Sequence, residues 1–420
     1  MRTLLAIIII IFLSCTSKEV KDKDKNQVSK KDSVIPAQKE IEPVKDSIVE
    51  TNEVVSSEPA LNYIPFNADN YFNNVTSVLS GLKGQAHKFN YLFDSVAWSR
   101  HQFYVDSSWK KLEARRLKAM RNWAATEFST PNTICKTVFY PFSGPDFLTA
   151  TTFFPNADKY IMLGLEPVGK LPEFKKFKPG DHTVYSAHFK QSLGDIFVKS
   201  YFITRKMLQD FSSQKVNGLL PILTFFIRKT GHEISDIKYV YRYKQDSIVE
   251  RPYDVKMPDI EDGGTKKPFG VRVDFVQDGK NKSVYYFKYD VSNKKFNDTC
   301  AFYNYINKSK NVVTYIKSAS YLLHNNFMSN MRDLILNNSS YVIQDDTGIP
   351  YKFFTENNNW EMKLYGQYTK PVSDFTYLSM QKPLEEAYQK DSAKIGKLPF
   401  HLGYHWGSKK DVIIYASKKK

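Results

Sequence analysis

Cysteine is scarce in this chain. Three cysteines in 420 residues are too few for a fold held together by disulfides. Long apolar runs are also lacking: the only one covers Leu4–Leu13, and the mean hydropathy is −0.45, which excludes a polytopic membrane protein. What is present is a composition with 42% hydrophobic and 15% aromatic residues. That composition excludes a disordered or collagenous chain and allows one large domain or two medium ones.

The apolar run is too short to span a bilayer as a helix. It follows Arg2 and ends before Ser14-Cys15, so residues 1–14 read as a signal peptide. The segment Phe12-Leu13-Ser14-Cys15 resembles the lipobox of bacterial lipoproteins, apart from Phe12 at the usual leucine position. The resemblance implies cleavage before Cys15, lipidation of its thiol and acylation, for example with palmitate, of its amino group. Alternatives are an ordinary signal peptide with an adjacent cysteine, or an uncleaved anchor.

Residues 15–60 differ in composition from the rest of the chain. They contain no aromatic residue and mix lysine with acidic residues without a helical or strand period, which predicts a disordered, lipidated tether. The whole chain has a net charge of +16, and its excess of basic residues lies in residues 61–420. In the cell envelope this basicity favours an anionic polymer, lipid head groups or an envelope protein as the partner, and no nucleic acid. Thr16, in place of an inner-membrane retention Asp, favours the outer membrane.

The pattern of residues 61–420 predicts an α+β fold, with a helix-rich first half and a second half rich in antiparallel strands. Residues 61–420 are numerous enough to form two domains, with a boundary near residue 231. The expected helices cover residues 89–96, 109–123, 197–211, 219–227 and 319–336. The expected strands cover residues 134–140, 160–165, 237–243, 271–276, 284–289, 360–368 and 412–415, with a hairpin turn at 277–282.

The densest local motif is the run of residues 139–148, which contains Tyr140-Pro141-Phe142-Ser143-Gly144-Pro145-Asp146; Gly164-Leu165-Glu166-Pro167 follows it. These segments resemble an uncharacterised family of exported lipoproteins of Gram-negative bacteria. A second similar stretch is 320–353, which includes Asp345-Asp346. No activity is known for that family, so the resemblance implies a class of protein and no reaction.

Asp146 and Glu166 are the candidate catalytic residues. Each follows an expected strand, and two carboxylates at one sheet edge suit acid–base chemistry such as glycoside hydrolysis. The structural alternative, which we favour, is that Asp146 caps the next helix and Glu166 pairs with a lysine. Ser143 does not lie in a Gly-x-Ser-x-Gly nucleophile elbow.

The histidines and the remaining cysteines give weaker signals. His401 and His405 are four residues apart and could share a metal, but Pro399 and Gly403 oppose a helix and no third ligand is evident, so we expect no metal and no cofactor. Cys135 and Cys300 can form a disulfide in an oxidising periplasm or remain two free cysteines, and the sequence leaves both possibilities open.

Two functions remain. The first is a non-enzymatic, lipid-anchored envelope protein that binds a polymer or a protein in the periplasm or at the outer membrane. The second is a lipid-anchored hydrolase of an envelope glycan that uses Asp146 and Glu166. The two differ in whether the carboxylates face one site.

Overall fold

A computed structural model describes residues 70–83, 87–92, 95–203, 206–207, 216–242, 248–254, 267–356, 358–375, 377–390 and 392–419. The predicted signal peptide, Cys15 and the tether lie outside these residues, so they stay predictions. Residues 64–420 form one compact unit. None of the helices in the described ranges is long and apolar enough to cross a membrane.

The α-helices are α2 (Tyr71–Leu79), α3 (Val96–Leu112), α4 (Lys118–Glu127), α5 (Ser129–Ile134), α6 (Phe147–Phe153), α7 (Asp181–Lys199), α9 (Leu220–Lys229), α10 (Ala301–Asn307), α11 (Ser329–Asn338), α12 (Lys352–Thr355) and α13 (Lys382–Lys390). A π-helical turn, η3 (Glu113–Leu117), joins α3 to α4. The strands are β1 (Thr137–Tyr140), β2 (Lys159–Gly164), β3 (Glu233–Arg242), β4 (Ile248–Pro252), β5 (Gly270–Gln277), β6 (Lys280–Lys288), β7 (Val312–Ile316), β8 (Ser339–Gln344), β9 (Trp360–Gly366) and β10 (Val412–Lys418).

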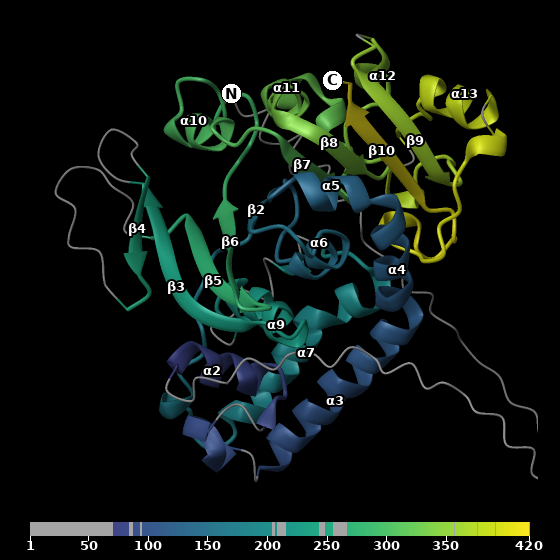
Figure 1. Cartoon of the computed structure of the whole chain (residues 1–420). Coiled ribbons are helices and arrows are strands. Elements are labelled where there is room, and N and C mark those ends of the chain that lie inside the picture. Colours follow the sequence, from purple (N-terminus) through teal and green to yellow (C-terminus); the bar gives the residue numbers. More distant parts are fainter. Residues whose placement is uncertain are drawn as a thin grey trace, which may run out of the picture. The chain divides into compact units, whose positions relative to one another are not determined.

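All of these strands form one mixed sheet in the order β4-β3-β5-β6-β2-β1-β7-β8-β10-β9 (Figure 1). The five central strands, β6 to β8 in that order, run parallel. Antiparallel strands extend the sheet on both sides, with β5, β3 and β4 beyond β6 and with β10 and β9 beyond β8. The α+β prediction is confirmed.

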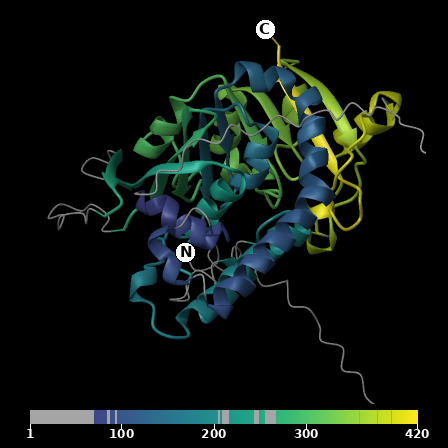
Figure 2. The ribbon, with the colours of Figure 1, turned by 60° about the horizontal axis from the view of Figure 1, so that its bottom comes forward.

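Helices cover both faces of the sheet, and alternate residues of each strand enter separate cores. On β1, Val138 and Tyr140 lie in the core under α3, α4, α6, α7 and α9, whereas Phe139 lies in the core under α10, α11 and α12. A small third cluster packs α13 on β9 and β10 through Leu384 and Ile414. Figure 2 shows α2, α3 and α7 together on the side of the first core.

The same sheet contains strands from both sides of residue 231, so the considered subdivision does not separate two sheets. The prediction of a helix over residues 319–336 is wrong for the first half of this range. Ser318, Ser320 and Tyr321 have φ of 54°, 52° and 55°, a left-handed conformation that no α-helix contains, and the helix begins at Ser329.

Cys135 and Cys300 do not form the considered disulfide, because both are free thiols. Cys135 is buried in the first core, whereas Cys300 packs against the second core, on the other face of the sheet. The Cys300 sulfur lies 2.9 Å from the Tyr289 hydroxyl instead. Burial raises the pKa of Cys135 to about 11, so this thiol is unreactive.

Candidate functional site

The connections of the parallel strands diverge between β1 and β7. The chain passes from β1 to β2 and β6 in one direction, and then returns to β7 and β8 on the other side of β1. In open α/β sheets, ligands bind outside the carboxyl ends of the strands at such a switch point. Here that position lies between the loop that begins at Pro141 and the loop that begins at Lys317.

An ion pair joins these two loops. The Lys317 ammonium lies 2.5 Å from the Asp146 carboxylate, and the two side chains are only 2% and 1% exposed. Asp146 also accepts bonds from the Tyr140 hydroxyl at 3.0 Å and the Thr149 hydroxyl at 2.5 Å. Its other oxygen caps α6 by accepting the Thr149 N–H at 3.1 Å. Asp146 therefore caps α6, as predicted, and in addition forms a buried ion pair with Lys317.

Arg116 reaches the same region through an irregular helix. The π-helical turn contains one extra residue, which changes the phase of the helix, so Arg116 is 5% exposed and does not lie on the exposed basic face that α-helical spacing predicts. It donates to the Ile196 carbonyl at 2.8 Å. Burial lowers the pKa of Arg116 to about 10; Arg115 lowers it as well, and Asp146 opposes the shift.

Lys317, like Arg116, also donates a hydrogen bond to a backbone carbonyl near the end of α7. It donates a second bond, at 2.5 Å, to the carbonyl of Ser200, the residue that ends α7. Burial lowers the pKa of Lys317, and the Asp146 carboxylate opposes this shift. The site therefore contains two buried cations, from η3 and from the end of β7, around one buried carboxylate.

A second carboxylate group follows β8. Asp345 accepts the Ser318 N–H at 2.8 Å and the Thr347 hydroxyl at 2.5 Å. Burial and the neighbouring Asp346 charge raise the pKa of Asp345 to about 6. Asp346 accepts the Tyr321 hydroxyl at 2.6 Å, so residues of the β7 loop connect Asp146 to both aspartates.

The backbone at this edge is strained. Phe142 and Ser200 have φ of 60° and 73°, in addition to the three left-handed residues of the β7 loop. Such conformations are costly for residues with a Cβ and concentrate at functional sites. Gly144, at φ +52°, follows Phe142 and faces Glu166, whose carboxylate oxygen would lie 3.7 Å from a Cβ there.

Several buried polar atoms at this edge have no hydrogen-bond partner among the described residues: Arg116 Nε, Ser200 Oγ, Tyr315 Oη, Ser318 Oγ and Asp346 Oδ1. An unsatisfied buried polar group costs about 1–3 kcal/mol. Unpaired buried polar atoms of this kind are commonly partners of a bound ligand or an ordered water.

Glu166 lies at the end of β2, 1% exposed. It accepts the Leu165 N–H and the Tyr286 hydroxyl, both at 3.1 Å. None of its described contacts is with a lysine, so the predicted lysine pairing belongs to Asp146 instead. Asp146 and Glu166 share the carboxyl edge of the sheet, but none of the described residues forms a hydrogen bond with both side chains.

The side chains of His401 and His405 contact different carboxylates. His401 Nδ1 lies 2.5 Å from Asp411, which is 3% exposed, whereas His405 Nε2 lies 3.9 Å from Asp346. Burial lowers the pKa of His405, but Asp346 opposes this and the net shift is upward. The described ranges contain no group of three or more His, Cys, Asp and Glu side chains that could hold a metal.

Sequence reasoning found Asp146 and Glu166 but missed Lys317, Ser318 and Arg116. Lys317 and Ser318 directly follow the β-branched and aromatic run of β7, which is a usable signal for a strand end. Arg116 had no signal, because its inward position depends on the π-helical turn. Comparison of the chain with family models, with curated proteins and with solved structures gives no match.

Proposed function

We propose that the chain is a lipid-anchored protein of the bacterial cell envelope whose folded part binds a small polar ligand at the carboxyl edge of β1 and β7. The observation that carries the proposal is the Asp146–Lys317 pair, buried at the switch point of the sheet. Buried charge is expensive, and perturbed buried groups are concentrated at functional sites.

The hydroxyl groups of Ser200 and Ser318 support this proposal. Both are buried without a partner, and both are held in a left-handed conformation by contacts of their backbone. A structural role would be served better by glycine at these positions. Hydroxyls that instead bind a ligand explain why serine stands there.

The position of Glu166 favours a ribose-containing ligand. The central strands have the order 3-2-1-4-5 when they are numbered along the chain. In doubly wound sheets of this order, an acidic residue at the end of the second strand binds the ribose hydroxyls, about 20 residues after a glycine turn. Gly144 and Glu166 occupy these two places. Because a shared fold does not imply a shared function, the ribose proposal is tested directly.

The test is thermal unfolding of the acyl-free mature chain, with Cys15→Ser, in millimolar adenosine, uridine, 2′,3′-dideoxyadenosine or glucose. A ligand that binds only the native state raises Tm. We expect adenosine and uridine to raise Tm, and the dideoxynucleoside to have a smaller effect because it lacks the diol. Glu166→Gln keeps an oxygen for Leu165 and Tyr286 and should abolish the difference between the two adenosines.

Ser318→Gly should lose the response to nucleosides, because it removes the hydroxyl and retains the backbone bonds of residue 318. Ser80→Ala is the matched control, since Ser80 Oγ is also buried and unpaired but lies at the end of α2. A response that is absent for all four compounds, or equal in Ser318→Gly and the parent, contradicts the ligand proposal.

The anchoring half of the proposal has its own test. Cys15→Ala in the full precursor should leave the protein in the aqueous phase of a detergent partition, or leave it unprocessed, because no thiol is available for lipidation. Partitioning into detergent that is the same for Cys15→Ala and the parent contradicts the lipoprotein proposal.

A further inference from the structure

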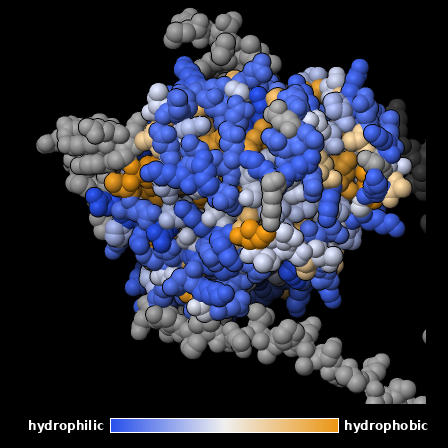
Figure 3. Space-filling view, turned by 45° about the horizontal axis from the view of Figure 1, so that its top comes forward, coloured by the Kyte–Doolittle hydropathy of each residue, from blue (hydrophilic) through white to orange (hydrophobic). Residues whose placement is uncertain are grey.

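Exposed apolar side chains gather at the amino-terminal end of the described domain. Tyr71, Tyr91, Val96 and Phe103 are 41%, 59%, 65% and 76% exposed. Phe103 is the most exposed large apolar side chain of the described ranges. By contrast, the face that carries α10, α11 and α12 is mainly hydrophilic, with apolar side chains in small groups (Figure 3).

The segments that carry these residues are packed against one another. His101 Nε2 lies 2.7 Å from the Leu79 carbonyl, and Gln102 donates to the Gly81 carbonyl at 3.1 Å, which holds the end of α2 against α3. Tyr71 and Tyr91 both contact the buried ring of Phe89, at centroid distances of 6.5 and 6.3 Å. The exposed side chains are therefore displayed by a packed framework.

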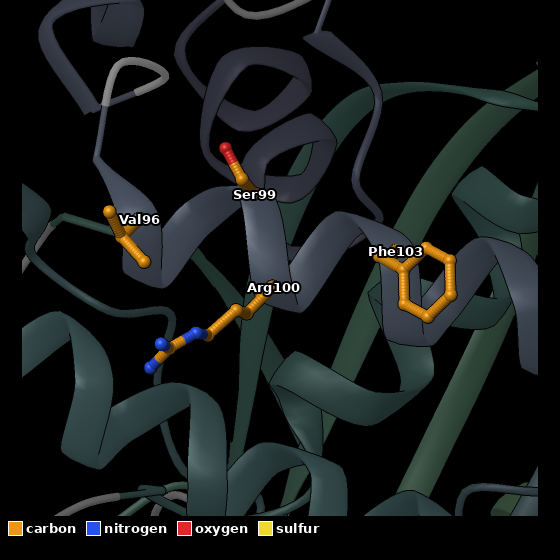
Figure 4. A pocket seen from close by; sticks show the side chains of 4 residues that line it. All are labelled: Val96, Ser99, Arg100 and Phe103. Carbon is orange, nitrogen blue, oxygen red and sulfur yellow. The ribbon is translucent and has the colours of Figure 1, made fainter.

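Val96 and Phe103 border a shallow hollow of about 370 Å³ on α3, together with Ser99 and Arg100 (Figure 4). Arg100 is exposed between the two apolar side chains, and Lys110 and Lys111 are exposed further along the same helix. Asp106, an acidic residue of α3, is paired with Lys229 at 2.8 Å. The helix thus presents apolar side chains flanked by cations.

We propose that this surface, defined by Tyr71, Tyr91, Val96, Arg100 and Phe103, lies on an anionic lipid bilayer. Aromatic side chains and arginine stems suit the boundary between head groups and acyl chains. Basic residues near an anionic membrane are attracted to its negative surface charge. The chain as a whole carries a net charge of +16, which complements such a membrane.

The course of the chain supports a bilayer as the occupant. Asn70, the first described residue, caps α2, so the preceding residues join the domain at this surface. A flexible chain of the length between Cys15 and Asn70 has a root-mean-square extension of roughly 40 Å. A domain anchored at Cys15 would meet the membrane at a high effective concentration, so a weak contact suffices.

Lipid anchoring belongs to the proposed function, but the membrane contact can be tested without it. The acyl-free mature chain with Cys15→Ser is sedimented with vesicles of phosphatidylcholine, alone or with 30% phosphatidylglycerol. We expect binding to the anionic vesicles that falls at least fivefold in the double variant Val96→Ser/Phe103→Ser. Arg100→Gln should weaken binding to the anionic vesicles about threefold, and high salt should do the same.

The matched control is Phe327→Ser/Tyr377→Ser, which removes exposed apolar side chains, 48% and 63% exposed, from other elements. It should bind as the parent does. Loss of vesicle binding by the α3 variant alone supports the proposal. Absence of binding by the parent, or equal binding by the two double variants, overturns it. A parent dimer that the α3 variant dissociates, without vesicle binding, assigns the surface to a second copy of the chain and also overturns it.

Discussion

At the scale of single residues, Asp146 combines two roles that the sequence presents as one. The turn composition before α6 predicts a cap, and the Thr149 N–H is indeed bound. The ion pair is invisible in the sequence because Lys317 lies 171 positions away. Only the parallel pairing of β1 with β7 brings the two loops together.

The substitution Lys317→Met tests how much this ion pair contributes to the free energy of unfolding. The substitution leaves the Asp146 carboxylate buried without its cation, which should cost about 3–5 kcal/mol of unfolding free energy. The double variant Lys317→Met/Asp146→Asn should recover more than half of that loss, because the amide is neutral and still caps α6. Urea unfolding of the three proteins measures both effects. A double variant no more stable than Lys317→Met would show that the charge of Asp146 is not the cause.

The raised pKa of Asp345 predicts that the stability of the protein depends on pH. Its pKa is raised to about 6 by burial and by Asp346, so the folded state favours the protonated form. The stability from this group is fully present below about pH 4, the pKa of an unfolded aspartate, and is lost as pH rises through 6. Asp345→Asn removes this titration, although it also weakens the bond from Ser318.

The measurement is Tm from pH 4 to 7 for Asp345→Asn and the parent. The difference in Tm should shift in favour of the variant as pH rises across this range. A constant difference would mean that Asp345 titrates in the folded protein as it does in the unfolded chain.

At the scale of secondary-structure elements, local patterns located most strands but failed where the backbone departs from regular geometry. The hairpin of β5 and β6 forms as expected, with Asp278 and Gly279 at positive φ in its turn. Clear failures are Arg116, displaced by a π-helical turn, the broken helix after Tyr321, and the helix expected over 197–211, because α7 already ends before Ser200 in a left-handed conformation. All of them depend on tertiary contacts that hold an unfavourable conformation, and side-chain periodicity contains no record of these contacts.

Ser200→Gly should stabilise the protein. Ser200 ends α7 at φ 73°, a conformation that glycine adopts without the cost of about 1 kcal/mol that a Cβ imposes. The substitution also removes a buried unpaired hydroxyl and keeps the carbonyl that Lys317 uses. We expect a gain of about 1 kcal/mol in chemical unfolding. Ser200→Ala retains the Cβ and serves as the comparison; a gain as large in alanine would assign the effect to the hydroxyl alone.

At the scale of the whole molecule, the fold class followed from the sequence, but the order of the strands did not. Sequence patterns predict β1 and β2 but not β7, and the parallel pairing of β1 with β7 joins segments more than a hundred residues apart. The ion pair of the candidate site is a product of that pairing. Asp146 and Glu166 could be named in advance because each follows a predicted strand, whereas the place of Lys317 depends on the pairing of β1 with β7 and that of Arg116 on the π-helical turn.

Because the two thiols lie on opposite faces of the sheet, we expect reductant to leave the thermal stability of the protein unchanged. Tm with and without dithiothreitol should agree within about 1 °C, because no disulfide constrains the unfolded chain. Titration of the denatured acyl-free chain, with Cys15→Ser, should find two thiols. A titration that finds none until reductant is added would mean that Cys135 and Cys300 pair in a different arrangement of the sheet.

The place of β10 has a consequence for how the molecule is made. This last strand of the chain lies between β8 and β9 and pairs with both. Until its residues become available, β8 keeps a row of unpaired backbone groups, which is a template for association with other chains. We therefore expect a chain truncated before residue 412 to leave β8 with an open edge and to aggregate. Terminal segments of many domains tolerate trimming, whereas residues 412–418 lie inside the sheet and complete it.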